Sequence, residues 1–139
     1  MKRIVLDTNI FVAGLRSRNG ASFALLRLIA LRQVKPLVST ALFLEYEAVL
    51  KRPEQLAIHG FSVTEIDRMM GEFAALCEPV DVHFLWRPQL ADIQDEMVLE
   101  AAINGRADAL VTHNLRDFAP AARFGMPVLT PAAFLEGTK

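Results

Sequence analysis

Carboxylates follow the apolar segments of this chain, at positions where α/β proteins often have their active-site residues. Asp7 comes directly after Ile4–Leu6, and Asp117 comes shortly after Ala109–Val111, with Asp95 in the stretch between. An acid at the end of a strand lies at the carboxyl edge of a parallel sheet, where open α/β folds build their sites. If these acids converge, their oxygens would form a site for a hard divalent cation.

Glu45 lies where an ordinary surface acid would not. A helix is predicted over residues 41–51, and Glu45 falls on its apolar stripe between Leu42 and Val49. Burying an unpaired carboxylate costs several kcal/mol. The position therefore favours a functional role for Glu45, and a partly exposed helix edge is the alternative.

A second group of acids opens the helix predicted from residue 92. Asp92, Asp95 and Glu96 are spaced i, i+3, i+4 at its positive end. Capping alone could explain Asp92, whereas Asp95 is a candidate site residue. We expect Glu96 and Glu100 to form a solvated face.

The acids are more persuasive as a set than one by one. Two carboxylates about 4 Å apart repel by about 4 kcal/mol at an effective dielectric constant near 20. Four of them would strain a marginally stable domain unless a divalent ion removed the repulsion.

The elements that must position these acids alternate along the chain, which predicts an α/β fold: a parallel sheet with helices on both faces. Strands are expected at residues 3–7, 36–39, 80–84, 108–112 and 126–129, and helices at 21–33, 41–51, 62–76, 92–104 and from 131. Residues 112–118 are expected to form a loop.

Composition limits the classes of protein. The 139 residues are 53% hydrophobic, which suits one globular domain over 1–139. The net charge of −1 shows no general basic character, but without the four candidate acids it becomes +3, so a polyanionic substrate remains compatible. Cys77, the single cysteine, excludes an intramolecular disulfide. Apolar runs too short for export or for a membrane span favour the cytoplasm.

The ordered set of acidic segments resembles the four motifs of the PIN domain family. These segments are Asp7-Thr8-Asn9, the helical Glu45, residues 95–102 and residues 111–118. The likeness covers essentially the whole chain and is to single-domain bacterial toxins of type II toxin–antitoxin systems. It implies a five-stranded parallel sheet in the order 3-2-1-4-5 and a metal-dependent ribonuclease activity.

The resemblance also implies roles for individual residues. The catalytic acids would be Asp7, Glu45, Asp95 and Asp117; the supporting residues would be Thr8, Asn9, Asp92, Thr112 and Asn114. Asp7, Asp95 and Asp117 would bind Mg²⁺ or Mn²⁺, which hard carboxylate oxygens select, while Glu45 would orient the attacking water. His113 is expected to be a loop histidine without a function.

Three arginines are candidates for binding RNA phosphates. Arg16 and Arg18 are expected in a loop just after the Asp7 segment, and Arg116 lies in the fourth motif. A solvated loop is an equally good interpretation of Arg16 and Arg18. The partners implied by the family are a cognate antitoxin protein and a second copy of the chain in a homodimer.

Other classes stay open. A PIN-fold binding module could use the same acids for a structural metal without catalysis. A phosphatase of the haloacid dehalogenase type also begins from a strand-ending aspartate, but it needs a second acid where this chain has Asn9. A receiver-like signalling domain would need a lysine after its fourth strand, and none is suitably placed here.

Overall fold

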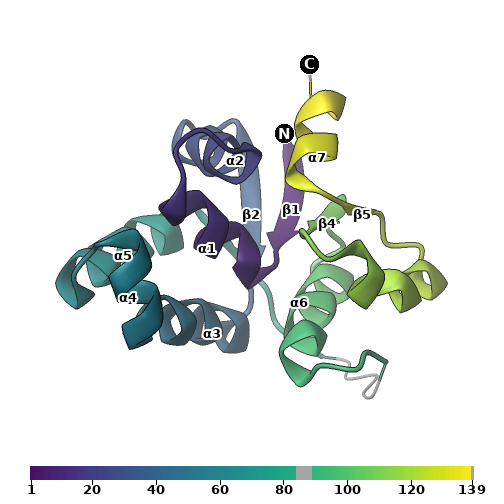
Figure 1. The fold of residues 1–139 in the computed structure, drawn as a ribbon. Coiled ribbons are helices and arrows are strands. Elements are labelled where there is room, and N and C mark those ends of the chain that lie inside the picture. Colours follow the sequence, from purple (N-terminus) through teal and green to yellow (C-terminus); the bar gives the residue numbers. More distant parts are fainter. Residues whose placement is uncertain (84–88, 139) are drawn as a thin grey trace.

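The fold is built on five parallel strands. The computed structural model describes residues 1–83 and 89–138. The strands are β1 (Lys2–Leu6), β2 (Val34–Val38), β3 (Glu78–Pro79), β4 (Ala109–Val111) and β5 (Val128–Leu129). Their order in the sheet is β3-β2-β1-β4-β5, which confirms the expected topology and fold class (Figure 1).

The register of the central strand brings two distant segments together. Strand β1 pairs in parallel with β2 on one side and with β4 on the other, and Leu6 stands opposite Val111. The two residues that follow, Asp7 and Thr112, therefore leave the sheet side by side at its carboxyl edge.

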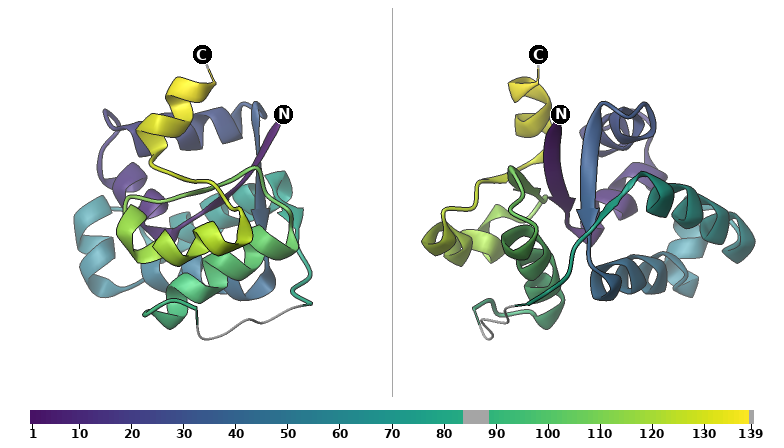
Figure 2. Two further views of the ribbon diagram at one scale, coloured as in Figure 1. Left: turned by 90° about the vertical axis from the view of Figure 1, so that its right-hand side faces the viewer. Right: turned by 180° about the vertical axis from the view of Figure 1, so that it is seen from behind.

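Helices cover both faces of the sheet. They are α1 (Thr8–Arg16), α2 (Ala21–Ala30), α3 (Thr40–Leu50), α4 (Pro53–His59), α5 (Val63–Leu76), α6 (Ile93–Asn104), the 3₁₀ helix η1 (Leu115–Phe124) and α7 (Pro131–Gly137). Helix α6 lies against one face of β1 and β2, whereas α2 and α7 lie on the other (Figure 2).

Local side-chain chemistry sets several helix ends. Ser62 and Glu65 form the expected capping box at the start of α5. The Asp92 carboxylate accepts the backbone N–H of Gln94 at 2.8 Å and so caps α6. Ser39 caps α3 by accepting the N–H of Leu42 at 3.2 Å. The caps at Ser39 and Asp92 hold the helices that carry Glu45 and Asp95.

The structure differs from the sequence predictions at one strand, two helices and one loop. The third strand is Glu78–Pro79 rather than 80–84, because the ladder with β2 ends soon after Pro79 pairs with Val38; Phe84 lies outside the described residues. Helices α1 and α4 were not predicted. Residues Leu115–Phe124 form a 3₁₀ helix where a loop was expected.

Aromatic side chains support the end of β1. Phe11, Tyr46 and Phe73 pack against one another, with ring centroids 4.7 to 6.0 Å apart. The fully buried Tyr46 hydroxyl donates a hydrogen bond to the carbonyl oxygen of Leu6. Tyr46 of α3 thereby fixes the peptide group just before Asp7.

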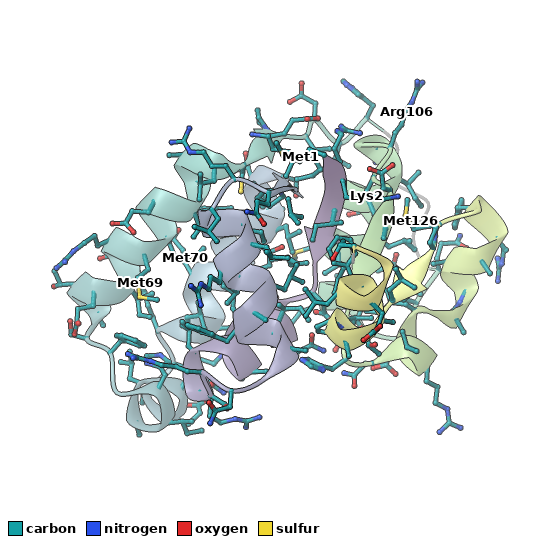
Figure 3. The ribbon with its side chains drawn as sticks, turned by 90° about the horizontal axis from the view of Figure 1, so that it is seen from above. Met1, Lys2, Met69, Met70, Arg106 and Met126 are labelled. Atoms are coloured by element: carbon teal, nitrogen blue, oxygen red, sulfur yellow. The ribbon has the colours of Figure 1, made fainter. Side chains whose placement is uncertain are left out.

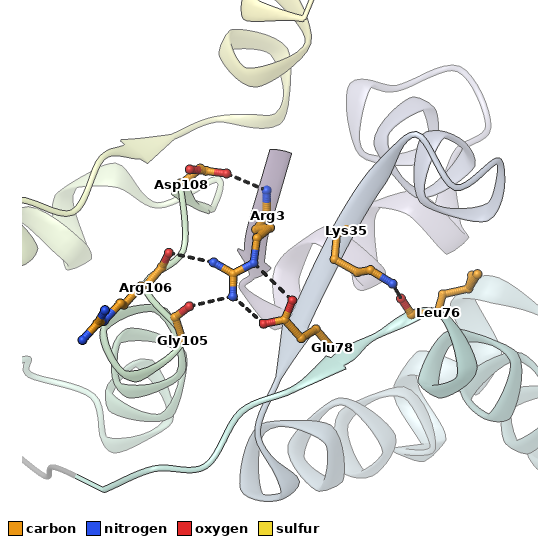
Figure 4. Close-up of polar contacts among 7 residues, drawn as sticks. All are labelled: Arg3, Lys35, Leu76, Glu78, Gly105, Arg106 and Asp108. Carbon is orange, nitrogen blue, oxygen red and sulfur yellow. Dashed lines mark hydrogen bonds and ion pairs between the residues drawn. The ribbon is translucent and has the colours of Figure 1, made fainter. Parts of the chain in front are cut away.

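The amino end of β1 is held by a cluster of charged and backbone groups. The Arg3 guanidinium bonds both carboxylate oxygens of Glu78 and the carbonyl oxygens of Gly105 and Arg106 (Figure 4). The Arg3 backbone N–H donates to the Asp108 carboxylate at 2.8 Å. Met1, Lys2 and Arg106 lie at this same end of the molecule (Figure 3).

Gly105 ends α6 where the helix meets the sheet. A Cβ atom at this position would lie 2.9 Å from the Ala101 carbonyl oxygen, 2.9 Å from Val80 Cγ2 and 3.0 Å from Leu37 Cδ1. The close approach therefore requires glycine, and it fixes how α6 leads into β4. Among the described residues, no helix combines the length and apolar character that a membrane span requires.

Candidate active site

Asp7 is the buried acid of the site. It directly follows β1, and only 7% of its surface is exposed. Its backbone N–H donates to the Val111 carbonyl oxygen at 2.9 Å, which extends the pairing of β1 with β4 by one residue. The Thr112 hydroxyl donates to Asp7 Oδ2 at 2.7 Å. The carboxylate is thus fixed by the neighbouring strand.

The predicted polar neighbours form one network around Thr112. Besides donating to Asp7, Thr112 Oγ1 accepts the backbone N–H of Asn114 at 2.9 Å and the side-chain amide of Asn9 at 3.4 Å. Thr8 is the first residue of α1, and its backbone N–H also faces the Asp7 carboxylate. The structure brings these supporting residues together at the carboxyl edge of β1 and β4.

Burial raises the pKa of Asp7 above its ordinary value. The hydroxyl of Thr112 and the backbone N–H groups of Thr8 and Asn9 oppose that rise by stabilising the ionised form, while the charge of Asp117 adds to it. A bound cation would favour the ionised form further. The hydrogen bonds to Asp7 therefore offset its burial only in part.

Asp95 lies in the first turn of α6 and lines a pocket with Ala91, Asp92, Ile93 and Asp117. Its pKa is raised from 3.8 to about 7, first by desolvation and then by the negative charges of Asp7, Asp92, Asp117 and Glu96. The structure therefore brings Asp7, Asp92, Asp95 and Asp117 within electrostatic reach of one another. Shifted pKa values are concentrated at functional sites, because catalytic acids and bases need pKa values that suit their reaction.

Glu45 is half-buried in α3, a helix that packs against α1 and α6. Its Oε1 atom is buried and has no hydrogen-bond partner among the residues the structure describes. A buried carboxylate oxygen without a partner is costly, so it indicates a missing ligand or water. One carboxylate oxygen of Glu45 thus faces inward, while the residue as a whole is only half-buried.

The acids do not form a closed metal cage. Within residues 1–83 and 89–138, no three His, Cys, Asp or Glu side chains are close enough to hold one ion directly. The donors nevertheless suit Mg²⁺ or Mn²⁺, since all are hard carboxylate oxygens and one is an orphaned buried atom. Mg²⁺ commonly retains several waters and binds through one or two carboxylates, which this spacing allows.

The expectation of a solvated face at Glu96 and Glu100 was wrong. Both residues are buried, at 3% and 5% exposure. Glu96 Oε1 accepts the backbone N–H groups of Gln89 at 2.6 Å and Leu90 at 2.8 Å. The sequence signal was the spread of apolar residues around α6, which leaves little of its circumference for solvent.

The candidate RNA-binding arginines are dispersed. Arg16 is not in a loop: it is the last residue of α1, and that helix places it roughly 13 Å along its axis from the Asp7 end. Arg18 lies exposed in the connection from α1 to α2, and Arg116 lies exposed in η1. Helix α1 was missed because Thr8 and Asn9 resemble turn residues.

Two contacts at the site were not predicted. His113 lies in the expected loop, and its Nε2 shares a 2.7 Å hydrogen bond with the hydroxyl of Ser22 in α2. Tyr46 supports Leu6 from α3. Neither pair shows in the sequence, since each joins residues that only the folded chain brings together.

Comparison with known proteins gives the family. A family model described as "PIN domain" matches residues 3–116. This chain belongs to the PIN domain family. Among the solved structures that the PIN domain protein matches are two whose low sequence identities establish similarity of fold alone.

The first is described as VapBC2 from Rickettsia felis bound to a DNA fragment from their promoter; its TM-score is 0.64 at 17% identity, covering 92% of this chain and 98% of that one. The second is FitAB bound to an IR36 DNA fragment, with a TM-score of 0.62 at 19% identity, covering 92% of this chain and 94% of that one. No curated protein sequence matches significantly.

Proposed function

We propose that this PIN domain protein is an endoribonuclease that uses Mg²⁺ or Mn²⁺ to hydrolyse RNA phosphodiester bonds. The observation that carries the proposal is the pocket that Asp95 lines together with Asp92 and Asp117, where burial and the charges of Asp7, Asp92, Asp117 and Glu96 raise the pKa of Asp95 to about 7. Four acids from three separate chain segments gather around one position. The PIN domain family is one of nucleases. With a divalent cation bound among these negative charges, the site would hydrolyse a phosphodiester bond of RNA.

Asp7, Asp95 and Asp117 would hold the ion, directly or through water. A bound divalent ion supplies an acidified water and stabilises negative charge on phosphate oxygens. Thr112 keeps the Asp7 carboxylate oriented by its 2.7 Å hydrogen bond. Glu45, whose buried Oε1 has no hydrogen-bond partner among the described residues, would accept a hydrogen bond from the attacking water and orient it. Since water is the nucleophile, the product keeps a 5′-phosphate.

Asp92 would act mainly through structure. Its carboxylate caps α6, and its charge contributes to the raised pKa of Asp95. Asn9 and Asn114 would keep Thr112 in place through their contacts with its hydroxyl. We infer no direct contact of these three residues with the ion.

Substrate binding would use the exposed arginines. Arg116 is adjacent to Asp117 and is the best placed for a phosphate beside the site. Arg16 and Arg18 lie at the far end of α1 and would contact RNA at a distance from the cleaved bond. Replacing both with alanine should weaken RNA affinity and flatten its salt dependence, and an unchanged slope would reject their role.

We also propose that the protein is the toxin of a toxin–antitoxin pair, bound by a cognate antitoxin and assembled as a homodimer in the cytoplasm. Support comes from the family and from the fold shared with VapBC2 and FitAB, both described as complexes on DNA. Induced expression of the chain in bacteria, alone and with its genomic neighbour, tests this part. Growth arrest only in the first case is the expected result.

The nuclease proposal is tested by cleavage of structured RNAs in the presence of Mg²⁺ or Mn²⁺. Asp7→Asn and Asp95→Asn should each lower cleavage by about 100-fold or more, since loss of a residue that only orients a metal ligand costs 10–100-fold. Asp108→Asn is the matched control: the same substitution at the opposite end of the sheet, where Asp108 contacts the Arg3 backbone. Wild-type protein that binds Mn²⁺ yet cleaves no RNA would instead indicate a non-catalytic module.

A further inference from the structure

A buried serine connects helix α2 to the active site. Ser22 lies in the first turn of α2, and only 3% of its surface is exposed. Its hydroxyl shares a 2.7 Å hydrogen bond with His113 Nε2. A buried hydroxyl needs a partner, so this contact fixes the His113 ring against α2.

The backbone of His113 continues the connection. Its N–H donates to Asn9 Oδ1 at 3.4 Å, and the Asn9 amide donates to Thr112 Oγ1 at the same distance. Thr112 then donates to Asp7 Oδ2 at 2.7 Å. An unbroken series of hydrogen bonds thus runs from Ser22 to the carboxylate proposed to bind metal.

The segment between β4 and η1 needs this support. Strand β4 ends at Val111 and η1 begins at Leu115, so residues 112–114 belong to neither element. Two of the bonds that hold the segment are 3.4 Å long and therefore weak and sensitive to small displacements. From outside the segment, the backbone N–H of Thr112 donates to the Leu129 carbonyl oxygen at 2.9 Å, and the short Ser22–His113 bond holds the side chain of His113.

We propose that Ser22 and His113 are positioning residues for Asp7: their contact holds residues 112–114 so that Thr112 orients the Asp7 carboxylate. The catalytic consequence rests on the proposed nuclease function. The ordering of residues 112–114 and of the Asp7 carboxylate is a property of the metal-free protein and can be measured there. Groups that orient a metal ligand from outside the ligand set typically change affinity or activity by 10–100-fold.

Three variants separate positioning from general stability. Ser22→Ala removes the hydroxyl without adding bulk, and His113→Phe removes the ring nitrogens while keeping an aromatic ring. His113→Gln restores a polar group near Nε2 and serves as the rescue. Ser62→Ala is the control, because Ser62 caps α5, outside the Asp7 network; its loss should lower the melting temperature by about 4 °C and leave cleavage unchanged.

The first measurement is amide hydrogen exchange in the full-length, metal-free protein. Ser22→Ala and His113→Phe should accelerate exchange at the His113 and Asn114 amides, which donate to Asn9 and Thr112. Ser62→Ala should not. Equal exchange rates in wild type and Ser22→Ala would overturn the proposal, whatever the protein cleaves.

The second measurement is Mn²⁺ affinity by calorimetry, together with cleavage kinetics. Ser22→Ala and His113→Phe should weaken Mn²⁺ binding and lower kcat by about 10-fold each with little change in KM, and His113→Gln should recover much of both. Faster exchange with unchanged Mn²⁺ affinity and kcat would show a merely structural contact and reject positioning. Inactive wild type would count against the nuclease function alone, because the exchange comparison still decides whether the contact orders this segment.

Discussion

The two ends of β1 treat charge in opposite ways. At the amino end, Arg3 is paired with Glu78 and also satisfies two backbone carbonyl groups (Figure 4). At the carboxyl end, Asp7 is buried and Asp95 is surrounded by other acids. One strand thus carries a compensated cluster at one end and an uncompensated one at the other.

The directions of the pKa shifts express this difference. Arg3 lowers the pKa of Glu78 by hydrogen bonding to it and by its charge, so ionisation of Glu78 stabilises the fold. Burial and neighbouring acids raise the pKa of Asp95, so its ionisation destabilises the fold. Glu78 thus has a structural role, whereas the acids around Asp95 form the candidate site.

The largest expected effect comes from Asp95→Asn. Removing this charge should lower metal-dependent cleavage by about 100-fold or more, while raising the melting temperature in EDTA because the repulsion among the acids is relieved. Cleavage assays and thermal unfolding of the same samples check both signs. A variant that loses activity and stability together would contradict the contrast between the two ends.

The next effect is expected at the compensated end. Arg3→Ala should lower the free energy of unfolding by about 2 kcal/mol, because it breaks a charged pair and leaves two carbonyl groups without their donor. Lys2→Ala removes the same charge from the adjacent exposed position and is the control. Urea unfolding measures the difference. Cleavage per folded molecule should be unchanged in both variants.

A smaller effect is expected from pH in the absence of metal. The folded pKa of Asp95 is about 7 against an ordinary 3.8, so the folded state binds the proton more tightly and wild type loses stability as pH rises between these values. Asp95→Asn lacks this loss. The melting-temperature advantage of the variant should therefore be absent near pH 4 and reach a few degrees above pH 7. A constant difference across this range would refute the assignment.

The smallest effect is expected for Glu78→Gln. The pKa of Glu78 is depressed, so its ion pair stabilises the fold above the ordinary value of 4.5, and this contribution is lost as pH falls through the lower folded value. Because the pair is partly exposed, the difference at pH 7 should be only about 0.5 kcal/mol. Urea unfolding at pH 7 and at pH 3 checks that wild type and variant converge in acid.

Much of the fold followed from local patterns. The apolar run Ile4–Leu6 and the alternation of strands and helices were sufficient for the parallel architecture, and the caps at Ser62 and Asp92 marked helix starts. The short strand Glu78–Pro79 was not predicted, because its pairing with β2 depends on tertiary position and Pro79 is a poor strand former. Helix α1 escaped because Thr8 and Asn9 favour turns when read locally.

The acids of the candidate site could be predicted from the sequence, but the hydrogen bonds that hold the surrounding residues could not. Asp7 and Glu45 stood out because each carboxylate interrupts an apolar pattern, and the structure places both inward. Glu96 was predicted to be a surface acid although apolar residues surround α6, and the two loop N–H groups that satisfy its carboxylate could not be read from the sequence. The Ser22–His113 contact joins α2 to the end of β4, and no spacing rule along the chain relates them.

The absence of a side chain at Gly105 has consequences far from Gly105 itself. Helix α6 is a rigid rod that carries Asp95 in its first turn, roughly 15 Å along the axis from the glycine. A methyl group at 105 would meet backbone and core atoms at about 3 Å, so the rod would have to shift or tilt against β2. Asp95 would move with it and change its position relative to Asp7 at the end of β1. The relative position of Asp7 and Asp95 thus depends on the close packing around Gly105 at the other end of α6.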